Sequence, residues 1–411
     1  MAAAPDDVLD ELRGRLERYD AHRHPLQHAT VQFHLGGVLL AQGALDAAEE
    51  AFTTAAGLFG LRGARPEQAK ALNGLGATLR AAGRLDVAER ALEHAAAGLA
   101  AAGLPLDEGA ALYNLGLVMR EGGRAEAAAR VLERAVERLD ERRVPAQAAA
   151  ALRELGAARL DAGDADGAEA ALEAAVELSE RAGDAPGRAA AANALGLARL
   201  AGGRPEAATE AFAVAVASSP RALRPDAFAM AKANLALALE RAGDAPRARL
   251  AARQALAAPG AAEPVRAQAA ELIRRLGVPQ AEDLGTALDA AGDLAAEQLA
   301  REELLRSADA GDDARRSDAA EWVAVHARAR RDPTDVAQIW LGALLELPSD
   351  ALDRLVASAM QALAATDADT AETFREAVRR AMARFHIPQW MRLQDVFAQA
   401  ALDHGDPGPW R

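Results

Sequence analysis

The sequence predicts an all-α protein, in which a solenoid of six helix-turn-helix repeats is followed by a C-terminal helical bundle. Three observations lead to this prediction. A leucine followed by glycine or alanine returns every forty residues, a second glycine follows each of these leucines at a fixed distance, and small residues recur after that glycine. A strict period of this length is typical of stacked repeat arrays, in which one unit buries its apolar face only against its neighbours.

Each recurring residue has a mechanical role in the predicted unit. The pairs are Leu35-Gly36, Leu75-Gly76, Leu115-Gly116, Leu155-Gly156, Leu195-Gly196 and Leu235-Ala236. The second glycines, which can end a helix in a left-handed conformation, are Gly43, Gly83, Gly123, Gly163, Gly203 and Gly243. Alanines such as Ala48 and Ala55 in the following helix let neighbouring backbones approach closely. Prolines that fit the first turn of the next unit are Pro66, Pro105, Pro145, Pro186, Pro225 and Pro264.

This order of residues resembles the tetratricopeptide repeat family over residues 29–277. The resemblance implies a right-handed solenoid whose first helices line a concave groove. The unit departs from the family in two respects. It is forty residues long rather than about thirty-four. The large aromatic residue early in the first helix is also replaced, by Gln32, Leu72, Leu112, Leu152, Ala192 and Lys232.

The two ends of the array indicate its limits. A helix over 5–20, with Val8, Leu12 and Leu16 turned inward, predicts an N-terminal capping segment of residues 1–28. Residues 264–276 form a lone first helix that Gly277 and Pro279 stop, so the array with its C-terminal cap spans 29–277. A separate helical domain is therefore expected over 278–411.

The C-terminal domain has no repeat register but contains all four tryptophans, Trp322, Trp340, Trp390 and Trp410. Helices are predicted over 286–308, 318–331, 334–347, 350–365, 370–386 and 389–403. An apolar stripe on the fifth of these consists of Phe374, Val378, Met382 and Phe385. Two interpretations stay open, a bundle with tryptophans in its core and a docking surface with exposed tryptophans.

Composition limits the classes of function. The chain has no cysteine and a net charge of −14, which argues against thiol chemistry and against general nucleic-acid binding. The N-terminus is acidic and no apolar run is long enough to cross a bilayer, so we expect a cytoplasmic protein without membrane insertion. An Ala- and Arg-rich composition with two lysines, Lys70 and Lys232, favours a GC-rich bacterial genome.

No catalytic motif is recognisable, and the sequence predicts a protein that is not an enzyme and has no cofactor. The one histidine cluster is His22, His24, His28 and His34. His28 and His34 are six residues apart and point to different helix faces, so polar capping-loop residues are favoured over a metal site.

The resemblance also implies which residues contact a ligand, because the family uses fixed positions of the first helices. In this sequence those positions give Phe33, Lys70, Asn73, Arg80, Tyr113, Asn114, Leu117, Arg120, Arg153, Asn193, Leu197, Met230 and Asn234. The set has a basic, amide-bearing middle with apolar residues on either side. The family's carboxylate clamp is not intact here, so binding of chaperone tails is not carried over. The alternative is that these are ordinary solvated groove residues.

We expect a scaffold that binds a partner protein or peptide, for which an acidic or C-terminal peptide fits the basic middle. The first alternative is a peptide-sensing intracellular regulator with the C-terminal helical domain as its effector. A second alternative is an enzyme with a site in that domain. The sequence does not indicate the oligomeric state.

Overall fold

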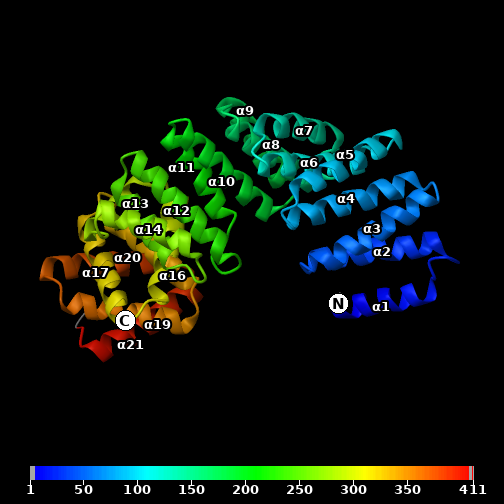
Figure 1. Ribbon diagram of the computed structural model, residues 1–411. Coiled ribbons are helices and arrows are strands. Elements are labelled where there is room, and N and C mark those ends of the chain that lie inside the picture. Colours follow the sequence, from blue (N-terminus) through cyan, green and yellow to red (C-terminus); the bar gives the residue numbers. More distant parts are fainter. Residues whose placement is uncertain (1–4, 407–409, 411) are drawn as a thin grey trace. The chain divides into compact units, whose positions relative to one another are not determined.

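The computed structural model describes residues 5–406 and 410, and every helix or strand in that part of the chain is an α-helix (Figure 1). The all-α prediction is confirmed. The chain divides into two compact units, Met1–Arg204 and Pro205–Arg411, and the division falls inside the fifth predicted repeat. Residues 1–4 of the predicted capping segment lie outside the described residues.

The first unit consists of a capping helix, four complete helical hairpins and the first helix of the fifth. Its helices are α1 (Pro5–Arg18), α2 (Pro25–Ala41), α3 (Leu45–Leu61), α4 (Arg65–Ala81), α5 (Leu85–Ala101), α6 (Pro105–Glu121), α7 (Ala125–Arg138), α8 (Pro145–Asp161), α9 (Ala165–Arg181) and α10 (Ala185–Ala201). The predicted capping helix is two residues shorter than expected, and Leu9 and Leu12 are its buried residues.

The glycine turns have the predicted geometry. Gly163 follows α8 with a φ of 84°, in the left-handed region that favours glycine. Its N–H donates to the Leu160 carbonyl (3.0 Å), and the next N–H, of Asp164, donates to the Arg159 carbonyl (2.8 Å). These bonds satisfy carbonyl groups that the end of α8 would otherwise leave unpaired, which explains the glycine that recurs after each leucine-glycine pair.

The glycine of the leucine-glycine pair has a different role, which is close packing. A Cβ atom added to Gly76 in α4 would lie 2.4 Å from Cγ of Leu92 in α5. At Gly156 in α8 the same atom would lie 2.5 Å from Cγ of Leu172 in α9. The two helices of one hairpin therefore approach until a leucine of the second helix fills the space above the glycine of the first.

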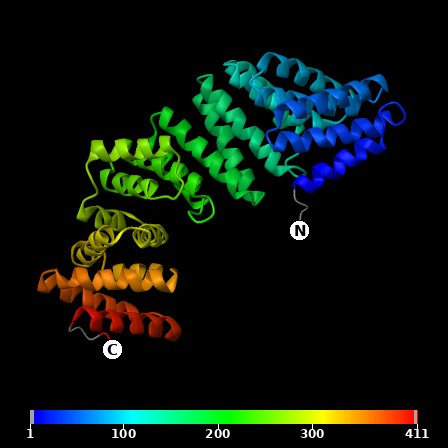
Figure 2. The same cartoon turned by 60° about the horizontal axis from the view of Figure 1, so that its bottom comes forward.

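Successive first helices also contact one another, in the pairs α2–α4, α4–α6, α6–α8 and α8–α10. The second helices contact mainly the first helices on either side. Figures 1 and 2 show the helices following one another in chain order. Because the first helices are closer together than the second ones, they line the inner side of this unit.

The second unit completes the repeats and continues into the C-terminal helices. Its helices are α11 (Pro205–Ala217), α12 (Pro225–Arg241), α13 (Ala245–Leu256), α14 (Glu263–Leu276), α15 (Ala281–Ala290), α16 (Asp293–Ala308), α17 (Asp312–Arg328), α18 (Pro333–Leu345), α19 (Ser349–Ala364), α20 (Ala368–Met382) and α21 (Ile387–His404). Gly277, with a φ of 85°, ends α14 as predicted.

The helices after α14 pack differently from the repeats. A helix here packs more extensively against the helix after next than against the one that directly follows it. This gives two series, α15–α17–α19–α21 and α16–α18–α20. The predicted helix over 286–308 is wrong, because extended backbone at Ala291 and Gly292 separates α15 from α16. Gly292 provides the N-cap of α16, and Asp293 provides a favourable negative charge in its first turn.

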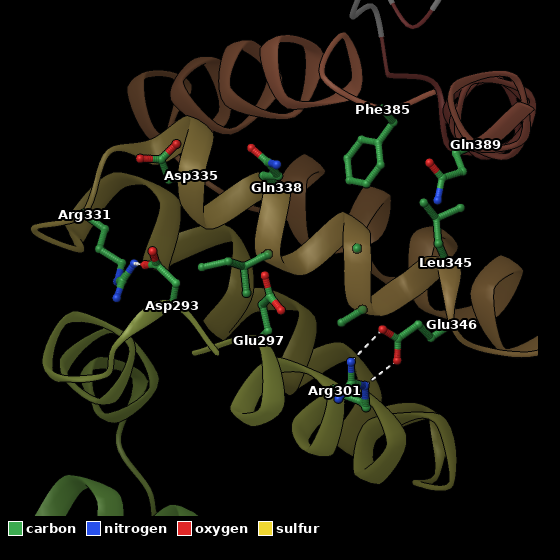
Figure 3. A pocket seen from close by; sticks show the side chains of 13 residues that line it. Asp293, Glu297, Arg301, Arg331, Asp335, Gln338, Leu345, Glu346, Phe385 and Gln389 are labelled. Atoms are coloured by element: carbon green, nitrogen blue, oxygen red, sulfur yellow. Dashed lines mark hydrogen bonds and ion pairs between the residues drawn. The ribbon is translucent and has the colours of Figure 1, made fainter. Parts of the chain in front are cut away.

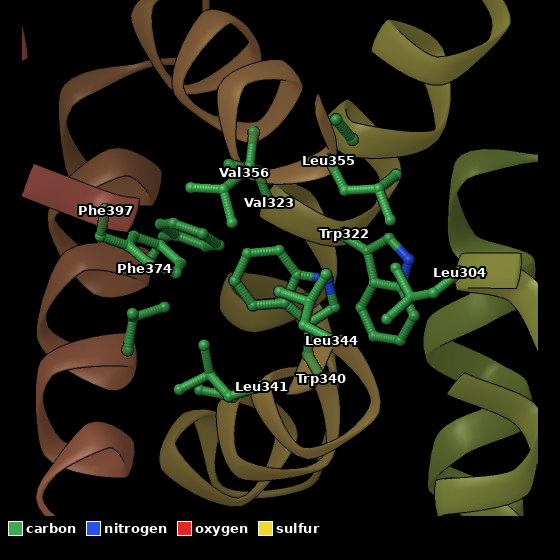
Figure 4. Packing of buried hydrophobic residues seen from close by; sticks show 14 of the residues in the cluster. Leu304, Trp322, Val323, Trp340, Leu341, Leu344, Leu355, Val356, Phe374 and Phe397 are labelled. Carbon is green, nitrogen blue, oxygen red and sulfur yellow. The ribbon is translucent and has the colours of Figure 1, made fainter. Parts of the chain in front are cut away.

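Aromatic residues form the core of the C-terminal helices (Figure 4). Trp340 lies at its centre, with ring centroids 5.5 Å from Phe374, 5.9 Å from Phe397 and 6.4 Å from Trp322. Trp410 packs on Phe397 at 5.2 Å. Trp322, Trp340 and Trp410 are buried, so the core interpretation holds for three of the four tryptophans.

Buried charges join the last repeat to the C-terminal helices. Lys232 of α12 pairs with Glu302 of α16, and both side chains are nearly inaccessible to solvent. Arg253 of α13 pairs with Glu303 of α16 (2.7 Å) and with Glu321 of α17 (3.1 Å). The domain boundary predicted near residue 277 stays a prediction, and these pairs cross it.

Candidate partner-binding groove

A hollow of 620 Å³ opens on the inner side of the first unit, between α1, α2, α3 and α4. Apolar side chains make up much of its wall, among them Val8, Phe33, Val38 and Phe52. Phe33 packs edge-on against Phe52, with ring centroids 5.9 Å apart. Such a surface suits a large apolar side chain of a ligand.

Three residues predicted to contact a ligand come together here, Phe33, Lys70 and Asn73. Gly37 lines the hollow from the middle of α2, and a Cβ atom added there would meet no atom within 4 Å. A side chain at this position would therefore project into the hollow. Gly37 thus contributes open space, in contrast to Gly76, where a leucine already fills it.

Amide groups continue the groove from the hollow toward the next repeat. Nδ2 of Asn114 in α6 donates to Oδ1 of Asn73 in α4 at 2.9 Å. This bond leaves the amino group of Asn73 and the carbonyl oxygen of Asn114 for other partners. One donor and one acceptor side by side match the hydrogen-bonding groups of a peptide unit.

Two cations of the predicted basic middle, Lys70 and Arg80, are each paired with a carboxylate of the following repeat. Nζ of Lys70 lies 3.0 Å from Oδ2 of Asp107, and Nη1 of Arg80 donates to Oε1 of Glu121 at 2.5 Å. All four side chains are partly exposed, so these pairs contribute little stability and can exchange partners.

Two arginines share a single carboxylate in the centre of the groove. Nη1 of Arg120 in α6 is 3.3 Å from Glu154 in α8, and Nη2 of Arg153 is 3.0 Å from the same group. Tyr113 lies beside them, and burial followed by the charge of Glu154 raises the pKa of its phenol. Lys70, Arg80, Arg120 and Arg153 and their ion-pair partners are four cations and three carboxylates, which leaves one positive charge in this set.

The remaining predicted residues occupy varied positions. Leu117 is buried in α6, Asn193 is half-buried in α10, and Leu197 of α10 is exposed. Met230 and Asn234 belong to α12 in the second unit, where Met230 is exposed. Asn234 is buried, and its Oδ1 accepts from Nε2 of Gln268 at 3.2 Å.

Sequence reasoning did not assign Asp107 and Glu121 to the groove, and it did not predict that Glu154 pairs with Arg120. A signal for them exists in the spacing. Lys70 and Asp107 are 37 residues apart, Arg80 and Glu121 are 41 apart, and Arg120 and Glu154 are 34 apart. In an array with a forty-residue period, such separations place two side chains on adjacent first helices, so opposite charges there predict an ion pair.

The described residues contain no group of three or more His, Asp or Glu side chains placed to hold a metal ion. His28, from the N-terminal cluster, makes a hydrogen bond between its Nδ1 and the Tyr19 carbonyl at 2.7 Å. Over the same part of the chain, no helix combines the length and the apolar character needed to cross a membrane.

Comparison with known proteins identifies the repeats. A family model described as tetratricopeptide repeat matches residues 27–101 and 147–220. No curated protein matches the chain.

Similar solved structures include the MamA protein, with 23% identity over 46% of this chain and 91% of that chain at a TM-score of 0.35. Pseudomonas aeruginosa pilF has 15% identity over 59% of this chain and 97% of that one, with a TM-score of 0.45. BtubC from P. vanneervenii has 16% identity over 65% of this chain and 92% of that chain, with a TM-score of 0.37.

Proposed function

Because the helical array of this chain belongs to the tetratricopeptide repeat family, we propose that the protein is a non-enzymatic adaptor, which binds an extended segment of a partner protein in the groove of its first unit. Repeats of this family generally mediate protein–protein interaction. We also propose that the protein is cytoplasmic and comes from a bacterium. Its composition supports the bacterial source.

The proposal rests on three kinds of surface that follow one another along the groove: an apolar hollow, a pair of amides and a surplus positive charge. The apolar hollow beside Phe33 and Phe52 takes a large side chain of the partner. The Asn73–Asn114 pair holds the partner's backbone, as amides do through one donor and one acceptor. The surplus positive charge at Arg120 and Arg153 takes a carboxylate, which is an acidic side chain or the C-terminus of the partner.

A partner carboxylate would replace Glu154 as the ligand of one arginine. Since Arg120 and Arg153 now share Glu154, one guanidinium can turn to the partner while the other keeps its ion pair. The exchange leaves no buried charge unpaired, which is the condition for a favourable net gain.

The first test changes the charge. The natural partner is identified by pull-down with the full chain, and its affinity is measured by calorimetry. Replacing Arg120 and Arg153 by Ala should weaken binding by about 2–4 kcal/mol, because charge-assisted hydrogen bonds contribute roughly 1.5–3 kcal/mol each and are not additive. A matched control replaces Arg84 and Arg124, which pair with Glu49 and Glu89 between repeats at the starts of second helices. Equal loss in both double variants would contradict the proposal.

The second test changes the shape of the hollow. Gly37→Leu should block it without harming α2, since leucine is a stronger helix former than glycine and no atom lies within 4 Å of the new Cβ. Gly37→Ala adds one methyl group and serves as the control for folding. Binding that survives Gly37→Leu unchanged would place the partner's apolar side chain elsewhere.

A peptide-sensing regulator is the second candidate, and the buried ion pairs of the second unit favour it. Lys232 and Arg253 belong to repeat helices and are paired with carboxylates of the C-terminal helices. A change in the repeats is thereby coupled to α16 and α17. If the natural partner alters hydrogen exchange in α16 and α17 when it binds, the regulator is favoured over a simple adaptor.

A further inference from the structure

A second hollow lies in the C-terminal helices, apart from the groove of the proposed function. It has a volume of 570 Å³ and opens between α16 and α18, with the segment from Phe385 to Gln389 as its third wall (Figure 3). Ile339, Ala343, Leu345 and Phe385 form the apolar part of its surface. Residues at helical spacing line both long walls, so the hollow follows the two helices for about 12 Å.

Gly342 makes this hollow deeper than it would otherwise be. It lies in the interior of α18, where glycine is about 1 kcal/mol less favourable than alanine. A Cβ atom added there would meet no atom within 4 Å, so packing inside the chain does not require glycine. At Gly76 and Gly156, by contrast, a leucine excludes any side chain. The space above Gly342 is open to an occupant.

The lining of the hollow is negatively charged. Four carboxylates, of Asp293, Glu297, Asp335 and Glu346, face two guanidinium groups, of Arg301 and Arg331. This leaves a formal charge of −2 on the lining.

Both guanidinium groups are already engaged. Arg301 makes a two-bond ion pair with Glu346, in which Nη2 and Oε1 are 2.7 Å apart. Arg331 binds Asp293 at 3.0 Å and the Leu288 carbonyl at 2.7 Å. Neither is available to bind a new acidic ligand without giving up these bonds.

Glu297 makes no ion pair of its own: Arg301, one turn further along α16, interacts with its charge but is bonded to Glu346. Glu297 lies on α16 between Asp293 and Arg301, in the position that Figure 3 shows between the two ion pairs. It is exposed, and no lysine, arginine or histidine of the described residues lies within ion-pair distance of it. Asp335, on the opposite wall, is paired at 2.6 Å with Arg384, which is outside the lining. The unmatched negative charge is therefore centred at Glu297.

We propose that this hollow is a docking site for a basic segment of a partner protein, one that places a large apolar side chain over Gly342 against Phe385 and an arginine or lysine on Glu297. Charge complementarity selects this occupant. An acidic peptide or an anionic lipid surface would meet a lining of its own sign. The site differs from the groove of the first unit, whose surplus charge is positive, so the two sites select ligands of opposite charge.

The test uses the full chain and two fluorescein-labelled synthetic peptides of ten residues. Both contain a central tryptophan, flanked by arginines in one peptide and by glutamates in the other. Fluorescence anisotropy at physiological salt measures binding. The arginine peptide should bind saturably with one-to-one stoichiometry, and the glutamate peptide should not bind.

Two variants address the two features of the site. Gly342→Leu fills the hollow and Glu297→Gln removes the unmatched charge, and each should weaken binding of the arginine peptide by about tenfold or more. Gly342→Ala and Asp353→Asn are the matched controls, since Asp353 is an exposed carboxylate of α19 outside the lining. Both controls should bind within twofold of wild type. Circular dichroism verifies folding. If Gly342→Leu does not fold, the affinity of Glu297→Gln for the arginine peptide is the test of the proposal.

Four outcomes would overturn the proposal. Equal binding by all variants would mean diffuse attraction of a basic peptide to an acidic chain. Equal binding of the two peptides would remove charge selection. Loss with Gly342→Leu but not with Glu297→Gln would leave an apolar site without a basic partner. A wild-type dimer that Gly342→Leu converts to monomer in light scattering would make a second copy of the chain the occupant.

Discussion

Lowering the pH from 7 to 5 should destabilise the C-terminal helices through one buried residue, His326. The imidazole is 1% exposed and is surrounded by Trp322, Trp340 and Phe374. Its Nδ1 donates to the Trp322 carbonyl at 2.6 Å, which fixes the neutral ring with its proton on that nitrogen. Burial lowers the pKa of His326 to about 4, against an ordinary value of 6.5, and the bond to the carbonyl only partly opposes this.

The sign of the effect follows from proton binding. Between pH 6.5 and 4 the unfolded chain binds a proton at His326 and the folded chain does not, so stability falls as the pH falls through this window. For a shift of this size the free energy of unfolding should be lower by about 2 kcal/mol at pH 5 than at high pH, and most of that loss should occur below pH 7.

Urea denaturation followed by tryptophan fluorescence measures this effect, because all four tryptophans lie in residues 322–410. His326→Phe keeps an aromatic ring in the core and removes the titration, so the difference in stability between wild type and variant should change with pH by this amount. Parallel pH profiles for the two proteins would refute the reasoning. Measurements stay at pH 5 and above. Burial raises the pKa of Glu321, but both proteins contain that carboxyl group, so the difference between their profiles isolates His326.

Three further predictions concern the fold. Gly163→Val should lower stability by roughly 1–3 kcal/mol, because a β-branched residue is strained at a φ of 84°; an unchanged thermal midpoint would show that the turn tolerates it. Glu303→Gln should lower the free energy of unfolding by about 3 kcal/mol, because it leaves Arg253 and Arg306 short of a buried partner; a loss below 1 kcal/mol would mean that Asp318 and Glu321 suffice. A fragment of residues 1–277, which the sequence predicts to fold alone, should give a helical circular dichroism spectrum without tryptophan fluorescence, and an unfolded fragment would move the boundary.

The repeat array is predictable from sequence because a period amplifies weak local signals. One glycine after an apolar helix is a poor indicator, but Gly43, Gly83, Gly123 and Gly163 at one spacing fix the turn. The C-terminal helices have no such repeat period. There the break at Ala291 and Gly292 escaped prediction, since a single glycine within an alanine-rich stretch does not by itself separate two helices.

The sequence assigned the candidate groove residues to the first helices, but it did not predict the ion pairs that these residues make. Family positions pointed to Lys70, Arg120 and Arg153, and these residues do lie on the first helices of adjacent repeats. Their ion pairs depend on which carboxylates the next repeat presents, and Asp107 and Glu154 are two of many acidic residues in the chain. Which carboxylate pairs with which cation depends on distances between residues of different repeats. The sequence pattern within one repeat does not contain this information.

The acidic hollow near Glu297 was not predictable at all. Its walls come from α16, α18 and the start of α21, which are far apart in sequence and follow no period. In the sequence, Gly342 cannot be told apart from a glycine such as Gly76. A glycine can allow close packing of two helices or leave open space, and only the structure distinguishes the two.

Hydrogen–deuterium exchange of the full chain, with and without its natural partner, tests the central claim most directly. Binding in the groove should slow exchange in the first helices α2, α4 and α6, over residues 25–41, 65–81 and 105–121. The second helices α3 and α5, over 45–61 and 85–101, should exchange at the same rate in both samples. Protection confined to the second helices would contradict the account, because it would place the partner on the opposite face of the array.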